Sequence, residues 1–81
     1  MKTVNYVPRG VCSRQIQFSL DGDVVRDVKF TGGCHGNLQG IAKLVEGMKV
    51  DEVLERLEGI DCNGKGTSCP DQFAKALKAY K

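Results

Sequence analysis

Two segments of alternating polar and apolar residues, separated by an Asp-Gly pair, place the strongest constraint on how this chain folds. Residues 15–20 put three apolar side chains on one face and polar side chains on the other, and residues 24–30 alternate again. This alternation is the period of a half-buried strand. Asp21-Gly22 lies between the two segments and suits a type I′ turn, in which both central residues need a positive φ. The sequence therefore predicts a β-hairpin with its turn at Asp21-Gly22.

The order of the patterns along the chain predicts the fold class. Residues 3–7 form a further alternating segment before the hairpin, and it ends at Pro8. After Phe30 the apolar residues recur every three to four positions, as they do in amphipathic helices. Strands first and helices second indicate an α+β fold, with a small antiparallel sheet of about three strands and helices packed on one face. A chain of 81 residues has room for one domain, 1–81.

Three helices are predicted, and a recognisable residue begins each of them. Asn37 is expected to cap the first helix and Asp51 the second, and a glycine follows each of these two helices. Cys69 is expected at the cap of the last helix. Pro70 then takes the first helical position, because proline has no N–H group to satisfy there.

Composition limits the functions that are open to this chain. Twelve basic and ten acidic side chains give a net charge of +2, which is too balanced to favour nucleic acid or an anionic membrane as a partner. No segment approaches 18 continuous apolar residues, so no membrane span is expected. The first ten residues lack the apolar stretch of a signal peptide, and the expected location is therefore the cytoplasm.

Four cysteines carry most of the chemistry that the sequence offers: Cys12, Cys34, Cys62 and Cys69. In the reducing cytosol such residues are interpreted first as metal ligands or redox groups, not as disulfides. They stand at the ends of predicted elements, where backbone N–H groups and helix dipoles stabilise a thiolate. Thiolate is the form that binds a metal or attacks a disulfide.

The spacing of the cysteines matches no familiar motif. The chain has no C-x2-C pair, so it contains neither a zinc ribbon nor a thioredoxin motif. Three or four thiolates can form a site only if the fold brings distant loops to one end of the domain. His35 is a further candidate ligand, because imidazole binds zinc and iron, and the alternative is a loop histidine that faces solvent or caps a helix. Inert thiols are the remaining interpretation.

Residues 67–71 read Thr-Ser-Cys-Pro-Asp, and the chain resembles the TSCPD domain family, which is named after this motif. The resemblance covers nearly the whole chain, including Gly33-Cys34 and the C-terminal helix. Such domains also occur at the C-terminus of adenosylcobalamin-dependent ribonucleotide reductases. The resemblance implies an accessory role beside ribonucleotide reduction in DNA synthesis. Any enzymatic activity would then be that of a ribonucleoside-diphosphate reductase-related oxidoreductase, although the chain is too short for a complete reductase.

The chain also resembles the U-type iron–sulfur scaffold proteins (IscU and the N-terminal part of NifU). In that family one cysteine precedes a hairpin, a second follows it in a Gly-Cys loop, and a third begins the last helix. Cys12, Cys34 and Cys69 match these three places. The resemblance implies an IscU/NifU-like α+β fold with three thiols at one end. Ser68 stands where the scaffold family has a histidine, and Arg14 where it has an acidic residue.

Taken together, these features predict a small cysteine-based metal-binding domain that holds Zn²⁺ or an iron–sulfur cluster. Cys12, Cys34 and Cys69 are the predicted ligands, with Cys62 or His35 as the fourth. The expected partner is a protein, either ribonucleotide reductase or the iron–sulfur machinery, and a second copy of the chain is also open. The alternatives are an iron–sulfur scaffold or carrier, a metal-free thiol–disulfide redox protein that uses Cys62 and Cys69, and a structural domain that docks a partner.

Overall fold

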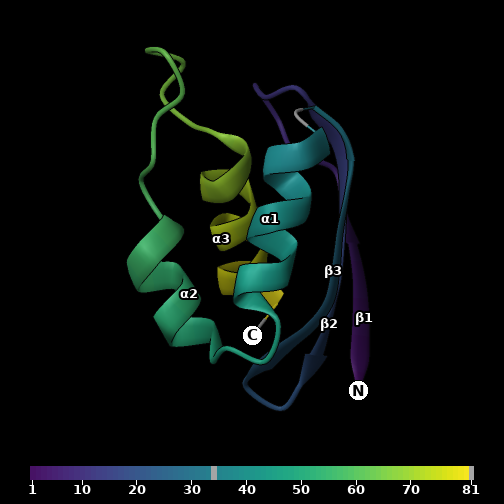
Figure 1. Cartoon of the computed structure of the whole chain (residues 1–81). Helices are drawn as coiled ribbons and strands as arrows, with labels where there is room; N and C mark the ends of the chain where they lie inside the picture. The colour runs from purple at the N-terminus through teal and green to yellow at the C-terminus, as the bar shows by residue number, and fades with distance from the viewer. Residues whose placement is uncertain (34, 81) are drawn as a thin grey trace.

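The chain forms a three-stranded antiparallel sheet with its helices on one face, which confirms the predicted α+β class (Figure 1). The computed structural model describes residues 1–33 and 35–80, without the side chain of His35. The strands pair in the order β1-β2-β3. Their bounds are β1 Lys2–Tyr6, β2 Ser13–Asp21 and β3 Val24–Gly32, and those of the helices are α1 His35–Val45, α2 Val50–Leu57 and α3 Cys69–Tyr80.

The predicted hairpin joins β2 to β3, but its turn lies one residue later than expected. Asp21 pairs with Val24, so Gly22 and Asp23 are the two loop residues. Gly22 has a φ of 63°, whereas Asp23 has no positive φ. A positive φ at the first loop residue alone is the pattern of a type II′ turn, in which glycine is preferred. The hairpin is confirmed, and the predicted type I′ turn at Asp21-Gly22 is wrong.

A β-bulge in β3 changes which of its side chains enter the core. An extra residue near Asp27, which has a φ of 54°, shifts the alternation of β3 by one position. Val25 is therefore fully buried before the bulge, and Phe30 packs against the same core after it. Simple alternation predicts that Val24 shares a face with Phe30. The structure instead makes Val25 the core residue at this end of the strand.

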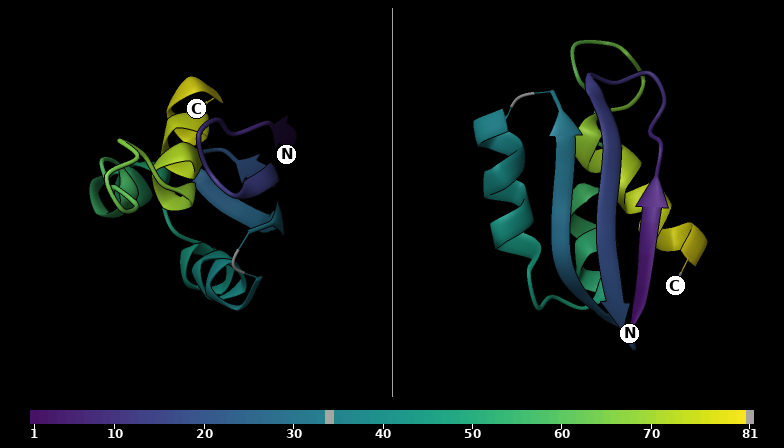
Figure 2. Two further views of the ribbon diagram at one scale, coloured as in Figure 1. Left: turned by 90° about the horizontal axis from the view of Figure 1, so that it is seen from above. Right: turned by 90° about the vertical axis from the view of Figure 1, so that its right-hand side faces the viewer.

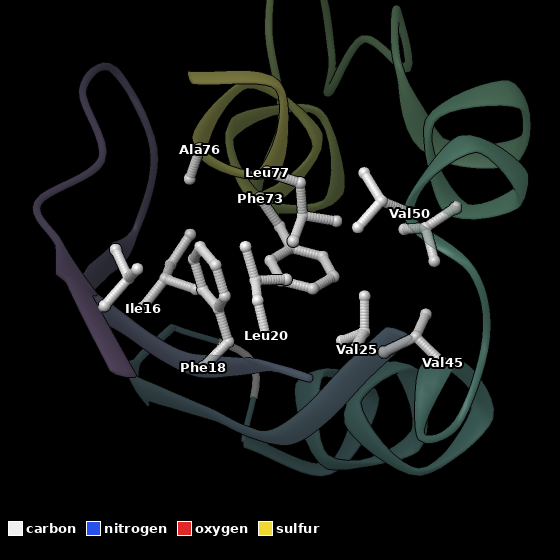
Figure 3. Packing of buried hydrophobic residues seen from close by; sticks show 11 residues of the cluster. Ile16, Phe18, Leu20, Val25, Val45, Val50, Phe73, Ala76 and Leu77 are labelled. Atoms are coloured by element: carbon white, nitrogen blue, oxygen red, sulfur yellow. The ribbon is translucent and has the colours of Figure 1, made fainter. Parts of the chain in front are cut away.

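The core lies between the sheet and α3, and aromatic rings meet at its centre (Figure 3). The ring of Phe73 in α3 contacts Phe18 of β2 and Phe30 of β3 edge to face, with centroids 5.6 and 5.7 Å away. Such aromatic pairs add to the free energy that burial alone supplies. The face predicted for β2 is confirmed, since its apolar residues are all buried in this cluster: Ile16, Phe18 and Leu20.

Two of the helices begin earlier than predicted. The structure starts α1 two residues before Asn37, which lies inside the helix. In α2 the cap position belongs to Lys49, not to Asp51. Val50 is buried in the core and its N–H donates to the carbonyl of Asp23, so tertiary packing fixes this helix start more strongly than the capping preference does.

Three parts of the chain lie at the same end of the molecule in both side views (Figure 1 and the right panel of Figure 2). They are the loop between β1 and β2, the loop between α2 and α3, and the end of β3 together with the start of α1. At the opposite end, the link between α1 and α2 runs beside the start of β3 and bonds to Val25 through two backbone hydrogen bonds. None of the helices described here has the length and apolar character that crossing a bilayer requires.

Replacing Phe73 with alanine is expected to lower the free energy of unfolding by about 3–5 kcal/mol, because it removes buried apolar area and leaves a cavity. The matched control is Leu44→Ala on α1, where the side chain is 78% exposed and the expected change is below about 0.5 kcal/mol. Urea unfolding followed by circular dichroism checks both variants. Equal effects of the two changes would contradict the core described here.

Candidate functional site

The start of α3 is fixed by a serine cap. Ser68 Oγ accepts a hydrogen bond of 3.1 Å from the backbone N–H of Asp71, and the Ser68 carbonyl accepts the first intrahelical bond at 2.8 Å. Ser68 is therefore the N-cap, Cys69 the first helical residue and Pro70 the second. The predicted cap at Cys69 is wrong by one residue. A serine oxygen is a better acceptor for the free N–H groups of a helix start than a cysteine sulfur is.

Asp71 is a buried carboxylate that joins three segments. It is 2% exposed, its Oδ1 accepts a 2.7 Å hydrogen bond from the N–H of Gly59, and its Oδ2 accepts one of 2.5 Å from the hydroxyl of Thr67. Lys75 Nζ lies 3.1 Å from Oδ2. Burial alone would raise the pKa of Asp71, but the hydrogen bonds and Lys75 outweigh it, and the pKa falls below its ordinary value of 3.8.

Gln72 extends this network to the loop between β1 and β2. Its amide Nε2 donates to Thr67 Oγ1 at 3.0 Å, and its Oε1 accepts from the N–H of Arg9 at 3.1 Å. The carbonyl of Thr67 in turn accepts a 3.0 Å bond from the N–H of Cys62. The two loops that carry Cys12 and Cys62 are thereby attached to the start of α3.

Two sulfur atoms meet at this start of α3. Cys12 Sγ lies 3.8 Å from Cys69 Sγ, although the two residues are 57 positions apart in the sequence. Both thiols are free; Cys12 is exposed, whereas Cys69 is 8% exposed. The separation is well beyond a disulfide bond of about 2.05 Å. The structure thus brings together two of the five residues that sequence analysis assigned to a site.

Gly33 lies against the Cys12 thiol of this pair. A Cβ atom at this position would stand 3.1 Å from Cys12 Sγ and 3.0 Å from a methyl carbon of Leu38, and the φ of 75° favours glycine. The absence of a side chain lets the end of β3 pass close to the sulfur of Cys12. The predicted ligand Cys34 lies outside the described residues, as does the side chain of His35.

A pocket of about 380 Å³ opens beside the two thiols. Cys62 lines this pocket together with Cys12 and Cys69, so a third predicted residue shares the same surface. Much of the remaining wall is apolar, with Leu38, Ile41, Ile60 and Pro70 among its side chains. Within residues 1–33 and 36–80 no three His, Cys, Asp or Glu side chains are arranged to hold a metal ion, so this part of the chain supplies a thiol pair.

Sequence analysis missed Ser13, which contacts one of these thiols. Its hydroxyl donates a 3.2 Å hydrogen bond to Cys69 Sγ, and the residue is 3% exposed. Ser13 faces inward because a second bulge places Arg14 and Gln15 opposite Thr31 alone. Extending the alternation of residues 15–20 backwards would put Ser13 on the outer face. No pattern in the sequence marks the bulge.

The comparisons with known proteins give one clear result. The family model of the TSCPD domain matches residues 1–81, which is the entire chain. The chain belongs to the TSCPD domain family. The resemblance carried by residues 67–71 is thereby confirmed. No curated protein and no solved structure matched the chain.

The structure explains most of the motif that names the TSCPD family. Three side chains of the motif form hydrogen bonds that hold the loop and cap α3, those of Thr67, Ser68 and Asp71. Pro70 lies in the first turn, where a missing N–H costs nothing. Cys69 is the member whose side chain faces another thiol and lines a pocket. The other four residues of the motif therefore hold Cys69 in position.

Acid is expected to destabilise this TSCPD domain through Asp71. Folding lowers the pKa of this carboxyl group, so the unfolded chain binds the proton more tightly than the folded one. The stabilisation is complete above the ordinary pKa of 3.8 and is lost as the pH falls through the lower pKa of the folded state. Asp71→Asn is expected to reduce stability at neutral pH and to flatten the acid dependence.

Urea unfolding of the metal-free protein between about pH 7 and pH 2, a range that extends well below the ordinary pKa of 3.8, measures this effect. The control is Asp21→Asn, which changes an exposed carboxylate at the end of β2 and is expected to leave the dependence close to wild type. An Asp71→Asn variant with the full acid dependence of the wild type would show that another group is responsible.

Proposed function

We propose that this TSCPD domain binds Zn²⁺ or an iron–sulfur cluster, with Cys12 and Cys69 as two of the ligands. The observation that carries the proposal is the 3.8 Å separation of their sulfur atoms. In a tetrahedral site with Zn–S bonds of about 2.3 Å, two thiolates stand about 3.8 Å apart. The pair therefore has the spacing of two metal-bound thiolates.

Two further ligands would complete a tetrahedral site. Cys62 is a candidate because it lines the same pocket as the pair. Cys34 is a candidate because it directly follows Gly33, which lies against Cys12 Sγ. We propose Cys34 as the third ligand and Cys62 or the neighbouring His35 as the fourth.

The surroundings of the pair suit a sulfur that is bound to a metal ion. Cys69 occupies the first turn of α3, where the helix dipole is positive, and it accepts a hydrogen bond from Ser13. The apolar side chains in the pocket wall keep the local dielectric low and strengthen a bond between metal and thiolate. Membership of the TSCPD family supports an accessory role beside ribonucleotide reduction, with the reductase as partner. The resemblance to the scaffold proteins favours the iron–sulfur machinery as the alternative partner.

Protein purified without oxygen is expected to contain about one zinc ion per chain, or to show the visible absorption of a cluster. Elemental analysis and an absorption spectrum distinguish these two outcomes. Cys12→Ser and Cys69→Ser are each expected to weaken metal binding more than about 100-fold, beyond what the loss of an outer-sphere contact causes. Cys34→Ser, Cys62→Ser and His35→Gln then identify the remaining ligands. Full metal content in both the Cys12 and Cys69 variants would contradict the proposal.

The same sulfur pair also favours a second candidate function, thiol–disulfide exchange. In the metal-free protein, the exposed Cys12 thiolate would attack a small disulfide such as oxidised glutathione and release one thiol. The Cys69 thiolate would then attack the Cys12 sulfur of the mixed disulfide and release the second thiol. The protein pair loses two electrons, and the small disulfide gains them. Cys12, and not Cys62 as the sequence predicts, is then the partner of Cys69.

Mass spectrometry of metal-free protein treated with oxidised glutathione tests this exchange. The expected product is a Cys12–Cys69 disulfide, which still forms in Cys62→Ser because that thiol takes no part. Cys69→Ser is expected to stop at the glutathione adduct of Cys12. If the wild type also accumulates only glutathione adducts, the exchange activity is excluded.

A further inference from the structure

We infer that Ser13 is a positioning residue for the site. Its hydroxyl holds the sulfur of Cys69 toward Cys12 and tunes the bond between this sulfur and a metal ion. This inference rests on the proposed metal-binding function. Its starting point is the 3.2 Å hydrogen bond that the Ser13 hydroxyl donates to Cys69 Sγ. Cys69 therefore has one polar neighbour that fixes its side chain and a second sulfur 3.8 Å away.

The backbone of β2 is distorted in a way that creates this contact. The bulge at Arg14 and Gln15 turns Ser13 from the outer face of the sheet to the inner face. A serine gains little from apolar packing, and its burial is costly unless the hydroxyl finds a partner. The partner supplied is the sulfur of Cys69. The bulge therefore brings the Ser13 hydroxyl to the sulfur of Cys69.

The chemistry of the acceptor indicates which form of Cys69 this contact suits. A neutral thiol is a weak acceptor, whereas a thiolate accepts a charge-assisted hydrogen bond that is about twice as strong as a neutral one. A buried hydroxyl aimed at sulfur is thus well satisfied only when the sulfur is anionic, as it is when it binds a metal. The bond withdraws electron density from the sulfur and lowers the energy of its lone pairs.

Cobalt(II) is a suitable probe, because thiolate ligands give it charge-transfer absorption in the near ultraviolet. Ser13→Ala is expected to move this band to longer wavelength, since loss of the hydrogen bond raises the energy of the sulfur lone pairs. Removal of cobalt by a chelator is expected to become on the order of 10-fold faster, as for other outer-sphere contacts of metal ligands. A role limited to folding would leave the position of the band unchanged.

Two further substitutions separate the hydroxyl from the shape of the side chain. Threonine and valine have nearly the same shape, so Ser13→Thr is expected to keep the wild-type band and Ser13→Val to behave like Ser13→Ala. The matched control is Ser19→Ala on the same strand. Ser19 is 6% exposed and its hydroxyl bonds to Thr3, at a distance of 3.2 Å. Circular dichroism verifies that each variant is folded.

The outcomes distinguish the two proposals. A wild-type protein without the thiolate-to-cobalt band overturns a single-ion site of the Zn²⁺ type, and the role of Ser13 with it. A wild-type band that stays in place in folded Ser13→Ala and Ser13→Val leaves the metal site standing and overturns the role of Ser13. A folded Ser13→Thr variant that matches Ser13→Val also overturns it. The role of Ser13 is established if the band shifts in Ser13→Ala and Ser13→Val but stays in place in Ser13→Thr and in Ser19→Ala.

Discussion

The arrangement of the candidate site depends on the buried carboxylate of Asp71. It accepts hydrogen bonds from a backbone N–H at the end of α2 and from a threonine hydroxyl in the following loop, and it pairs with Lys75 one helical turn later. A carboxylate removed from water is costly unless its oxygens are satisfied in this way. Because these partners come from three segments, the carboxylate holds the start of α3, which Ser68 caps, against the preceding loop and so fixes the place of Cys69.

This organisation gives a physical meaning to the five-residue motif. A motif is often regarded as a list of reactive groups, but here most of its side chains are committed to the protein itself. The two hydroxyl groups and the carboxylate all make hydrogen bonds within the protein, and the proline lies in the first turn of the helix. The cysteine among them is held at a fixed place beside a thiol from the other end of the chain. Rigid support of this kind is what a precise ligand or nucleophile needs.

The sequence predicted most of the fold because its patterns are local. The hairpin, the buried face of β2 and the three helices all follow from residue periodicity. The errors arose where tertiary contacts override local preference, as at Val50, whose burial sets the start of α2, and at Val25, which a bulge turns inward. For the site, the resemblance to the scaffold proteins implies that Cys12 and Cys69 lie at one end, and the structure places their sulfur atoms 3.8 Å apart. Their role as ligands stays a prediction. The contact of Ser13 with the site could not be predicted from the sequence, because only the register of the paired strands β2 and β3 reveals the bulge that buries this residue.

The separation of Cys12 and Cys69 along the chain has a consequence for the order of events in the cell. One thiol precedes the first strand of the hairpin, and the other begins the final helix, 57 positions later. Both can be present in one place only after the ribosome has synthesised and released the chain as far as α3. An ion shared by the two sulfurs would close this long loop and count toward the stability of the finished fold. Binding of the ion by both sulfurs would therefore follow the synthesis of α3. A chain that ends before α3 would lack Cys69 and would not bind the ion in this way.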